Sequence, residues 1–96
     1  MRNIELENEA LEDIEHLTLE GVIQFGIEQA ALYYDELFKQ FELLAEHPLL
    51  GRPVSDSHAD LLRFGFGSHI ILFSTDGDTI TIRRVLHGRM DILSHL

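Results

Sequence analysis

The spacing of hydrophobic residues changes once along the chain, and this change limits the folds that the sequence can adopt. Between residues 8 and 46, apolar residues recur every three or four positions, as they do on one face of a helix. Beyond residue 60 they alternate with polar residues, as they do on one face of a strand. Helices and strands that each bury one face must pack on one another, so we expect a two-layer α+β fold.

The front half of the chain predicts two helices joined by one or two residues. The first begins with Asn8 as its cap, and Gly26 ends it in a left-handed conformation. The second ends at Pro48, and helices joined so closely form an antiparallel hairpin. The stripes predicted to face the core are Ala10, Ile14, Leu17, Gly21 and Phe25, with Leu11 and Val22 alongside, and Ala30, Tyr34, Leu37, Phe41, Leu44 and Ala45.

Four segments predict strands. Residues 3–7 alternate apolar and acidic side chains, and "LLRFGF", "HIILFST" and "TITIRRVLH" follow a loop at residues 51–60. Asp76-Gly77 is a hairpin signal between the last two strands. In the final strand Arg84 shares the inward parity, so we expect it near an edge or beside an acidic residue. The inward positions are Ile80, Ile82 and Leu86, and the outward ones are Thr81, Arg83, Val85 and His87.

The predicted order of elements is β-α-α-β-β-β, in a single domain over residues 1–96. The helix hairpin covers one face of a sheet whose strands are mostly antiparallel, and the other face is left partly open. The arginines of the second half line that open face. We therefore expect the functional surface to lie there.

The net charge is confined to the front half of the chain. Residues 1–48 hold twelve acidic residues against Arg2 and Lys39, whereas residues 49–96 hold five acidic residues and five arginines. The net charge of −10 argues against direct binding of nucleic acid, because phosphate binding needs a positive potential. The asymmetry predicts acidic helices behind a neutral-to-basic working surface.

The composition also bears on the cellular location of the protein and on the cofactors that it could bind. The chain has no cysteine, no apolar run long enough to span a membrane and no signal-peptide pattern at its start, which together favour the cytoplasm. Its six histidines do not fall at the spacings of local metal sites. We expect no metal, no cofactor and no membrane partner.

Four stretches of sequence resemble one protein family. They are "GIEQAALYYDEL", "FELLAEHPLLGRP", "LRFGFGSHIILF" and "IRRVLHGRMDILSHL", in order from about residue 8 to the end. The "GSH" before an aliphatic run, followed by "RVLHGRMD", carries most of the specificity. The chain thus resembles the ParE branch of the RelE/ParE toxin superfamily, whose members are often labelled plasmid stabilisation proteins. Two departures are the acidic helix hairpin and Ser74-Thr75, where a Tyr-Arg is typical of the family.

The resemblance implies a fold and a function. The fold is the same β-α-α-β-β-β arrangement. The function is that of the toxin in a type II toxin–antitoxin system, which forms a hetero-oligomer with a ParD-type antitoxin, a ribbon-helix-helix protein. When released, such a toxin inhibits DNA gyrase by binding its A subunit and performs no chemistry of its own.

The alternative is a RelE-like, ribosome-dependent mRNA endonuclease. Such an enzyme needs cationic groups around the scissile phosphate and a general acid or base beside them. The arginines and the pair His69 and His87 could supply these groups. Lys39, Tyr33 and Tyr34, however, lie on the second predicted helix, away from the open sheet face. An acidic protein is also repelled by the ribosome, so we favour the binding toxin over the enzyme.

Two sets of residues are predicted to meet partners. Tyr33 and Phe38 lie off the core stripe of the second helix, which favours a role in antitoxin binding. The C-terminal segment and the neighbouring strands are predicted to face the target, because arginine and methionine are frequent interface residues. The predicted target-binding residues are Arg63, His69, Arg83, His87, Arg89, Met90 and Asp91.

Overall fold

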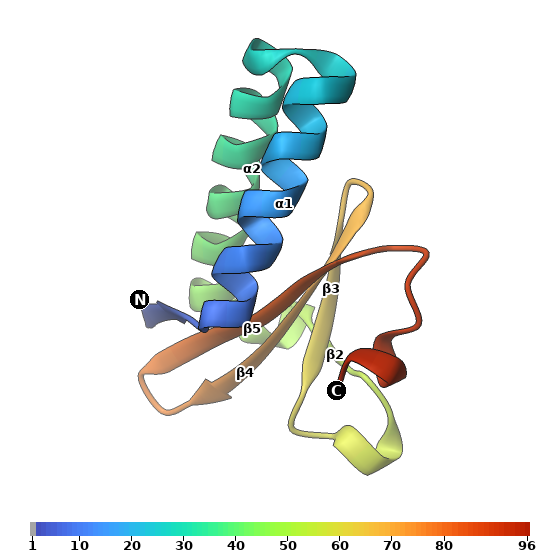
Figure 1. Ribbon diagram of the computed structural model, residues 1–96. Coiled ribbons are helices and arrows are strands. Elements are labelled where there is room, and N and C mark those ends of the chain that lie inside the picture. The colour runs from blue at the N-terminus through green and yellow to red at the C-terminus, as the bar shows by residue number, and fades with distance from the viewer. Residues whose placement is uncertain (1) are drawn as a thin grey trace.

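A helix hairpin lies on one face of a five-stranded sheet in the computed structural model, which describes residues 2–96 (Figure 1). The helices are α1 (Asn8–Phe25) and α2 (Ile27–Glu46), and single 3₁₀ turns occupy Pro48–Leu50, Asp56–His58 and Ile92–His95. Within the described residues, neither helix combines the length and the apolar composition needed to cross a membrane. The strands are β1 (Asn3–Leu6), β2 (Arg52–Pro53), β3 (Leu62–Phe66), β4 (His69–Asp76) and β5 (Thr79–His87).

The strand order in the sheet is β1-β5-β4-β3-β2. Strand β1 runs parallel to β5, and every other pair is antiparallel. The two-layer α+β prediction is therefore confirmed. The loop predicted at residues 51–60 contains one additional short strand, because Arg52 and Pro53 pair with Arg63 and Leu62.

The hairpin is confirmed, with Gly26 as its single joining residue. Gly26 has φ 89° and ψ 164°, a positive φ that favours glycine. The predicted cap is wrong, because Glu7 occupies the cap position, Asn8 is already helical, and the Glu7 side chain forms no capping hydrogen bond. The reason lies in the sheet: the Glu7 N–H donates to the Ile82 carbonyl and holds Glu7 in the extended conformation.

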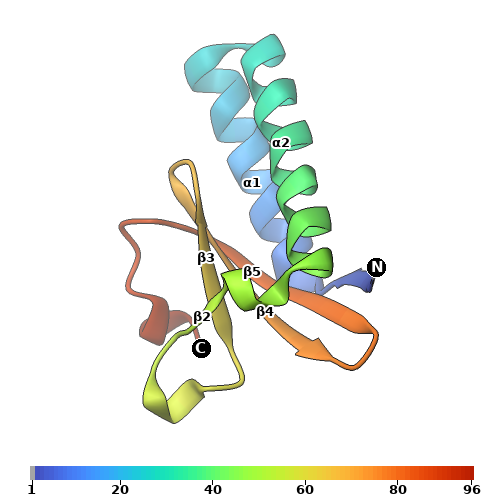
Figure 2. The same ribbon diagram turned by 180° about the vertical axis from the view of Figure 1, so that it is seen from behind.

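The helix hairpin is longer than the sheet that supports it, so its tip projects beyond the strands (Figures 1 and 2). The main core lies between the lower part of the hairpin and the sheet, and includes Ile14, Leu37 and Phe41. At the tip, Phe25 is 70% exposed and Val22 is exposed, and Leu11 near the start of α1 is exposed as well. The core stripe predicted through Phe25 thus ends at Leu17, because no strand lies under the final turns.

The two adjacent tyrosines have exchanged their predicted positions. Tyr34 is exposed, whereas Tyr33 is half-buried and packs against Phe66 with ring centroids 5.0 Å apart. Both positions have helical spacing from Ala30 and Leu37, so periodicity alone does not separate them. The end of β3 lies on the side of Tyr33 and determines which ring is covered.

A β-bulge changes the alternation of the last strand. Phe73 pairs with Ile82, whereas Leu72 pairs with Arg84, so Arg83 is an extra residue in β5. Beyond the bulge, Val85 therefore joins the core beneath the helices and Leu86 lies in a second cluster. The predicted inward position of Leu86 and outward position of Val85 are both wrong. The bulge also moves Arg84 off the predicted inward parity, to the face of its partner Leu72, but the predicted contact with an acidic residue is confirmed, because Arg84 binds Asp13 of α1.

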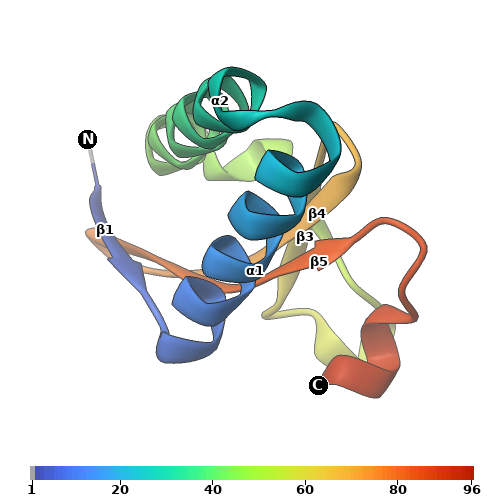
Figure 3. The same cartoon turned by 45° about the horizontal axis from the view of Figure 1, so that its top comes forward.

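The sheet face opposite the helices is less open than predicted. A second apolar cluster on that face joins Ile70, Leu72 and Leu86 to Ile92 of the C-terminal segment, and Val54 and Leu61 pack against it. Figure 3 shows the helix hairpin on one side of the sheet and the C-terminal segment on the other. The C-terminal segment therefore covers part of the sheet and does not project freely beyond it.

Candidate functional site

The structure separates the residues that were predicted to bind the target. His69 and His87 lie on the helix side, at the end of the sheet. Arg83 lies near the start of α1 and pairs with Glu7. Arg63 alternates with residues that pack under the helices and is paired with Leu72, so its side chain lies on the opposite face. The remaining three, Arg89, Met90 and Asp91, follow β5 and are exposed.

A groove opens between the upper part of the hairpin and the end of the sheet, with a volume of about 630 Å³. We call it the hairpin groove. It is lined by residues between 17 and 25 of α1, residues between 29 and 36 of α2, and Phe66, Ser68, His69 and His87. Its lining includes two glutamates, Glu20 and Glu36, and no arginine or lysine. The groove thus combines apolar walls with a negative rim.

Tyr33 connects the hairpin to the sheet at the base of this groove. The Ser68 N–H donates to Tyr33 Oη at 3.1 Å, and Oη lies 2.7 Å from His69 Nδ1. The intervening turn contains Gly67 with φ 55°, where a Cβ atom would lie 2.5 Å from Tyr33 Oη. Only glycine therefore lets the turn approach the ring so closely. Burial raises the pKa of Tyr33, and the Ser68 amide partly opposes this.

The surroundings of His69 favour its neutral form. Burial lowers its pKa most, the nearby His87 lowers it further, and Glu20 opposes both. The Tyr33 hydroxyl donates to the Phe66 carbonyl at 3.3 Å and accepts the Ser68 N–H, while its oxygen also lies 2.7 Å from His69 Nδ1.

The second histidine, His87, accepts a hydrogen bond from the backbone. The Arg89 backbone N–H donates to His87 Nδ1 at 3.2 Å, so the ring carries its proton on Nε2. The two imidazole rings lie 5.6 Å apart between centroids. His87 can therefore offer its Nε2–H to a bound partner. Within the described residues, no group of three side chains is placed to hold a metal ion.

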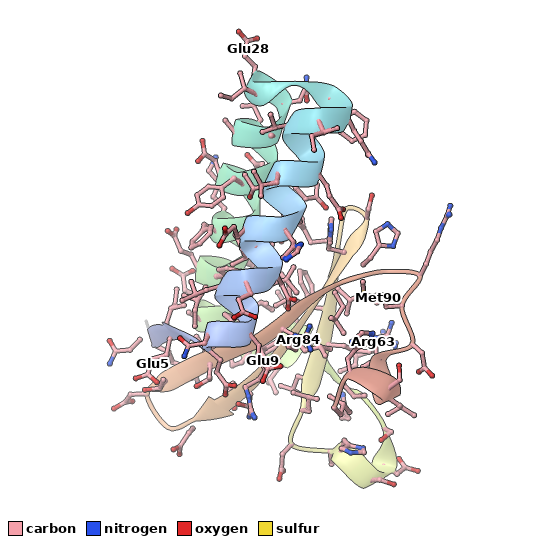
Figure 4. The ribbon with its side chains drawn as sticks, viewed as in Figure 1. Glu5, Glu9, Glu28, Arg63, Arg84 and Met90 are labelled. Atoms are coloured by element: carbon pink, nitrogen blue, oxygen red, sulfur yellow. The ribbon has the colours of Figure 1, made fainter. Side chains whose placement is uncertain are left out.

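Two arginines of β5 are bound within the chain. Arg84 Nε and a terminal nitrogen bind the two carboxylate oxygens of Asp13 at 2.8 and 2.9 Å, and Glu9 lies 3.4 Å away (Figure 4). These hydrogen bonds raise the pKa of Arg84. Arg83 forms the exposed pair with Glu7. Sequence reasoning expected an acid near Arg84, but no pattern identified Asp13.

The C-terminal segment contains both structural and exposed residues. Asp91 Oδ1 accepts the Leu93 N–H at 3.1 Å and caps the last 3₁₀ turn. Ile92 beside it is buried. Arg89 is exposed and Met90 is 46% exposed. Arg89 and Met90 are therefore accessible to another protein, as are Leu93 and Leu96, which are 55% and 49% exposed.

The residues predicted to meet the antitoxin are only partly accessible. Tyr33 and Phe38 are both half-buried and pack against the main core. A larger exposed apolar surface lies at the end of the hairpin, which sequence reasoning missed because it assigned part of it to the core. We call this the hairpin tip: Leu19, Val22, Ile23, Phe25, Ile27 and Leu32.

Comparison with known proteins gives consistent matches. The family described as "ParE toxin of type II toxin-antitoxin system, parDE" matches residues 4–92. Toxin ParE1 of Caulobacter vibrioides is 34% identical over 96 residues, which are 100% of this chain and 99% of that protein.

The fold is shared with solved structures of low sequence identity. A chain of the chromosomal ParDE toxin–antitoxin system from P. aeruginosa has a TM-score of 0.75 and 17% identity, with 91% of this chain and 96% of that chain covered. A chain of the RelBE2 toxin–antitoxin complex from Mycobacterium tuberculosis has a TM-score of 0.61 and 23% identity, with 90% of each chain covered. The sequence matches decide the family: this chain belongs to the ParE toxins of type II toxin–antitoxin systems.

Proposed function

We propose that this ParE-family toxin acts in the cytoplasm by binding the A subunit of DNA gyrase and inhibiting the enzyme, without catalysing a reaction itself. A ParD-type antitoxin of the ribbon-helix-helix class neutralises it by forming a hetero-oligomer. The observation that carries the proposal is the match with Toxin ParE1 over the whole length of the chain.

The placement of the charged residues supports a binding toxin. Cleavage of a phosphodiester needs cations and an acid–base group around one phosphate. Here the acid–base groups, His69 and His87, lie in a groove whose lining includes no arginine or lysine. The nearest basic side chain on α2, Lys39, is bound to Glu36 at 3.2 Å.

A ribosome-dependent mRNA endonuclease is the second candidate. The observation in its favour is the hydrogen-bonded pair of Tyr33 and His69, with His87 beside it, because these groups are capable of proton transfer. The fold is also shared with the RelBE2 complex.

The exposed Arg89 and Met90 are the proposed centre of the target-binding surface. Arg63 extends this surface, because it lies on the sheet face that the C-terminal segment covers. Asp91 supports the segment as a cap, and Arg83 is engaged by Glu7. His69 and His87 face the hairpin groove, together with Tyr33, and we assign that groove to the antitoxin.

Two binding measurements test the proposal. Co-expression with the adjacent gene, followed by gel filtration, is expected to give a hetero-oligomer, and recovery of free monomer alone would count against an antitoxin partner. Immobilised toxin is expected to retain the purified gyrase A subunit. The double variant Arg89→Ala with Met90→Ala should retain less of it, because anchor truncations cost about 2 kcal/mol, roughly thirtyfold in affinity. No retention of gyrase by the unmodified chain would contradict the proposed target.

A further inference from the structure

We propose that Arg52 and Arg63, which are cross-strand neighbours on the sheet face opposite the helices, bind an acidic segment of the target protein through its carboxylates. This inference rests on the proposed function for the existence of a protein target on this side of the sheet. The chemistry of the segment follows from the two arginines themselves, namely from their register, their exposure and the acidic partners that they lack within the chain.

A row of arginines crosses this face of the sheet. Arg84 of β5 pairs with Leu72 of β4. Leu72 in turn pairs with Arg63 of β3, which pairs with Arg52 of β2. Residues directly opposite one another in neighbouring strands point to the same side of a sheet, so the three arginines share one face. The row ends at β2, which is an edge strand.

Only the inner arginine of this row has acidic partners within the chain. Asp13 binds Arg84 at 2.8 and 2.9 Å, and Glu9 lies 3.4 Å from it. Among the described residues, neither Arg52 nor Arg63 has an acidic group within 4.0 Å, and both are exposed. Like charges directly opposite each other destabilise a sheet. The unbound chain therefore carries a repulsion that the carboxylates of a partner would relieve.

The edge strand favours recognition by side chains over the addition of a further strand. Strand β2 consists of Arg52 and Pro53 alone, and proline has no N–H to donate to a neighbour. A guanidinium group binds a carboxylate through two parallel hydrogen bonds, so each arginine can hold one acidic side chain. An extended segment with acidic residues at alternate positions presents carboxylates on one side, about 7 Å apart. Two long side chains on neighbouring strands can reach both.

The arginine pair adjoins the C-terminal segment. Ile92 of that segment packs in one cluster with Leu72, the strand partner of Arg63. Val54, two residues after Arg52, packs against the same cluster. Figure 4 shows Arg63 beside the C-terminal segment. The pair therefore continues the proposed target-binding surface toward the edge of the sheet.

The charges of the chain disfavour two other occupants. Strong binding to nucleic acid rests on many phosphate contacts, and a net charge of −10 repels a polyanion. A second copy of this chain would bring the same net charge of −10. A short acidic segment meets the arginines at contact distance, whereas the acidic hairpin lies on the other side of the sheet, where salt screens its repulsion (Figure 3).

Three probes test this inference with the complete chain, labelled with ¹⁵N and kept at low salt. They are an unstructured peptide with glutamate at alternate positions, the same peptide with glutamine instead, and a single-stranded oligonucleotide with as many negative charges as the first peptide. The Nε–H signals of Arg52 and Arg63 are expected to shift on addition of the glutamate peptide alone, and added salt should weaken this binding. No shift with the glutamate peptide, or tighter binding of the oligonucleotide, would overturn the inference.

Single substitutions separate the arginine pair from the general charge of the chain. Arg52→Gln and Arg63→Gln are each expected to weaken binding of the glutamate peptide about fivefold. Lys39→Gln, an equal change of charge on an exposed residue of α2, should have a much smaller effect. Equal weakening by all three changes would show that the attraction is not specific to the pair and would overturn the inference.

The same variants distinguish a binding role from a structural one. Because the two arginines repel each other in the unbound chain, Arg52→Gln and Arg63→Gln should leave the thermal midpoint unchanged or raise it slightly. A lower midpoint with unchanged peptide affinity would assign the arginines to the fold and overturn the inference. Gel filtration is expected to show a monomer, and a dimer that Arg63→Gln dissociates would identify a second copy as the occupant instead.

Failure of this inference can be told apart from failure of the proposed function. Equal retention of the gyrase A subunit by the unmodified chain and by the double variant Arg52→Gln with Arg63→Gln would refute the acidic segment alone. A chain that binds the glutamate peptide through both arginines but retains no gyrase would refute the proposed target alone.

Discussion

At the scale of single residues, the carboxylate of Asp13 accepts a backbone hydrogen bond that a neighbouring strand would otherwise accept. Strand β1 ends opposite Ile82, so the following part of β5 has no neighbouring strand on that side. There the Val85 N–H donates to Asp13 Oδ2 at 2.9 Å, and the same carboxylate binds Arg84. One side chain of α1 thus satisfies both an edge amide and the guanidinium of Arg84.

Asp13→Asn is expected to lower the free energy of unfolding by about 2 kcal/mol, because it removes the charge from hydrogen bonds to a partly buried arginine. The matched control is Glu7→Gln, which weakens the exposed pair with Arg83 and should cost less than about 1 kcal/mol. Urea unfolding of both variants makes the comparison. Equal losses would mean that the Asp13 contacts are worth no more than a surface ion pair.

The depressed pKa of His69 predicts a dependence of stability on pH. A histidine with a lower pKa in the folded chain binds protons more weakly there than in the unfolded chain, so acid favours unfolding. The His69 contribution should be constant above its ordinary value of 6.5, and the unfolding free energy should fall as the pH decreases below it. Urea unfolding between neutral and mildly acidic pH is expected to show a smaller fall for His69→Gln. An identical fall in the variant would show that His69 does not cause it.

At the scale of elements, the spacing of apolar residues predicted the individual helices and strands. It did not predict features that depend on the contact between two elements. The hairpin, the three antiparallel strands and the first strand followed from the spacing of apolar residues. The bulge at Arg83 did not, because it arises where β5 changes its neighbour from β1 to α1. The exchange of Tyr33 and Tyr34 has the same origin, because the end of β3 lies beside Tyr33 and covers that ring. For the candidate site, the sequence suggested individual residues as a prediction, but it did not indicate that they lie on two faces of the sheet.

The C-terminal segment combines the buried Ile92 with exposed residues such as Arg89 and Met90, and separate variants can distinguish their roles. Ile92→Ala is expected to cost about 2 kcal/mol of stability, because Ile92 fills the cluster with Ile70, Leu72 and Leu86. Arg89→Ala with Met90→Ala should change stability by less than about 0.5 kcal/mol and yet relieve growth arrest. Thermal unfolding and growth after induced expression measure the two effects. A stable double variant that still arrests growth at the same dose would place the toxic surface elsewhere, with the hairpin as the first candidate.

At the scale of the whole molecule, the acidic hairpin and the C-terminal segment lie on opposite sides of the sheet (Figure 3). His87 belongs to both surfaces, because its ring lines the hairpin groove and its Nδ1 accepts the amide of Arg89. The charge is divided in the same way, with the whole net charge in residues 1–48. This division fits the proposed function, in which the acidic helix side binds the antitoxin and the C-terminal segment binds the target.

The activity of purified gyrase tests the central claim most directly. Relaxed plasmid, gyrase and ATP are incubated with increasing amounts of the toxin, and a parallel reaction contains ribosomes stalled on message. We predict that supercoiling falls or cleaved plasmid accumulates with dose, that Arg89→Ala with Met90→Ala weakens this effect, and that the message remains intact. Cleavage of the message with full gyrase activity retained would contradict the account and identify the chain as a ribosome-dependent endonuclease.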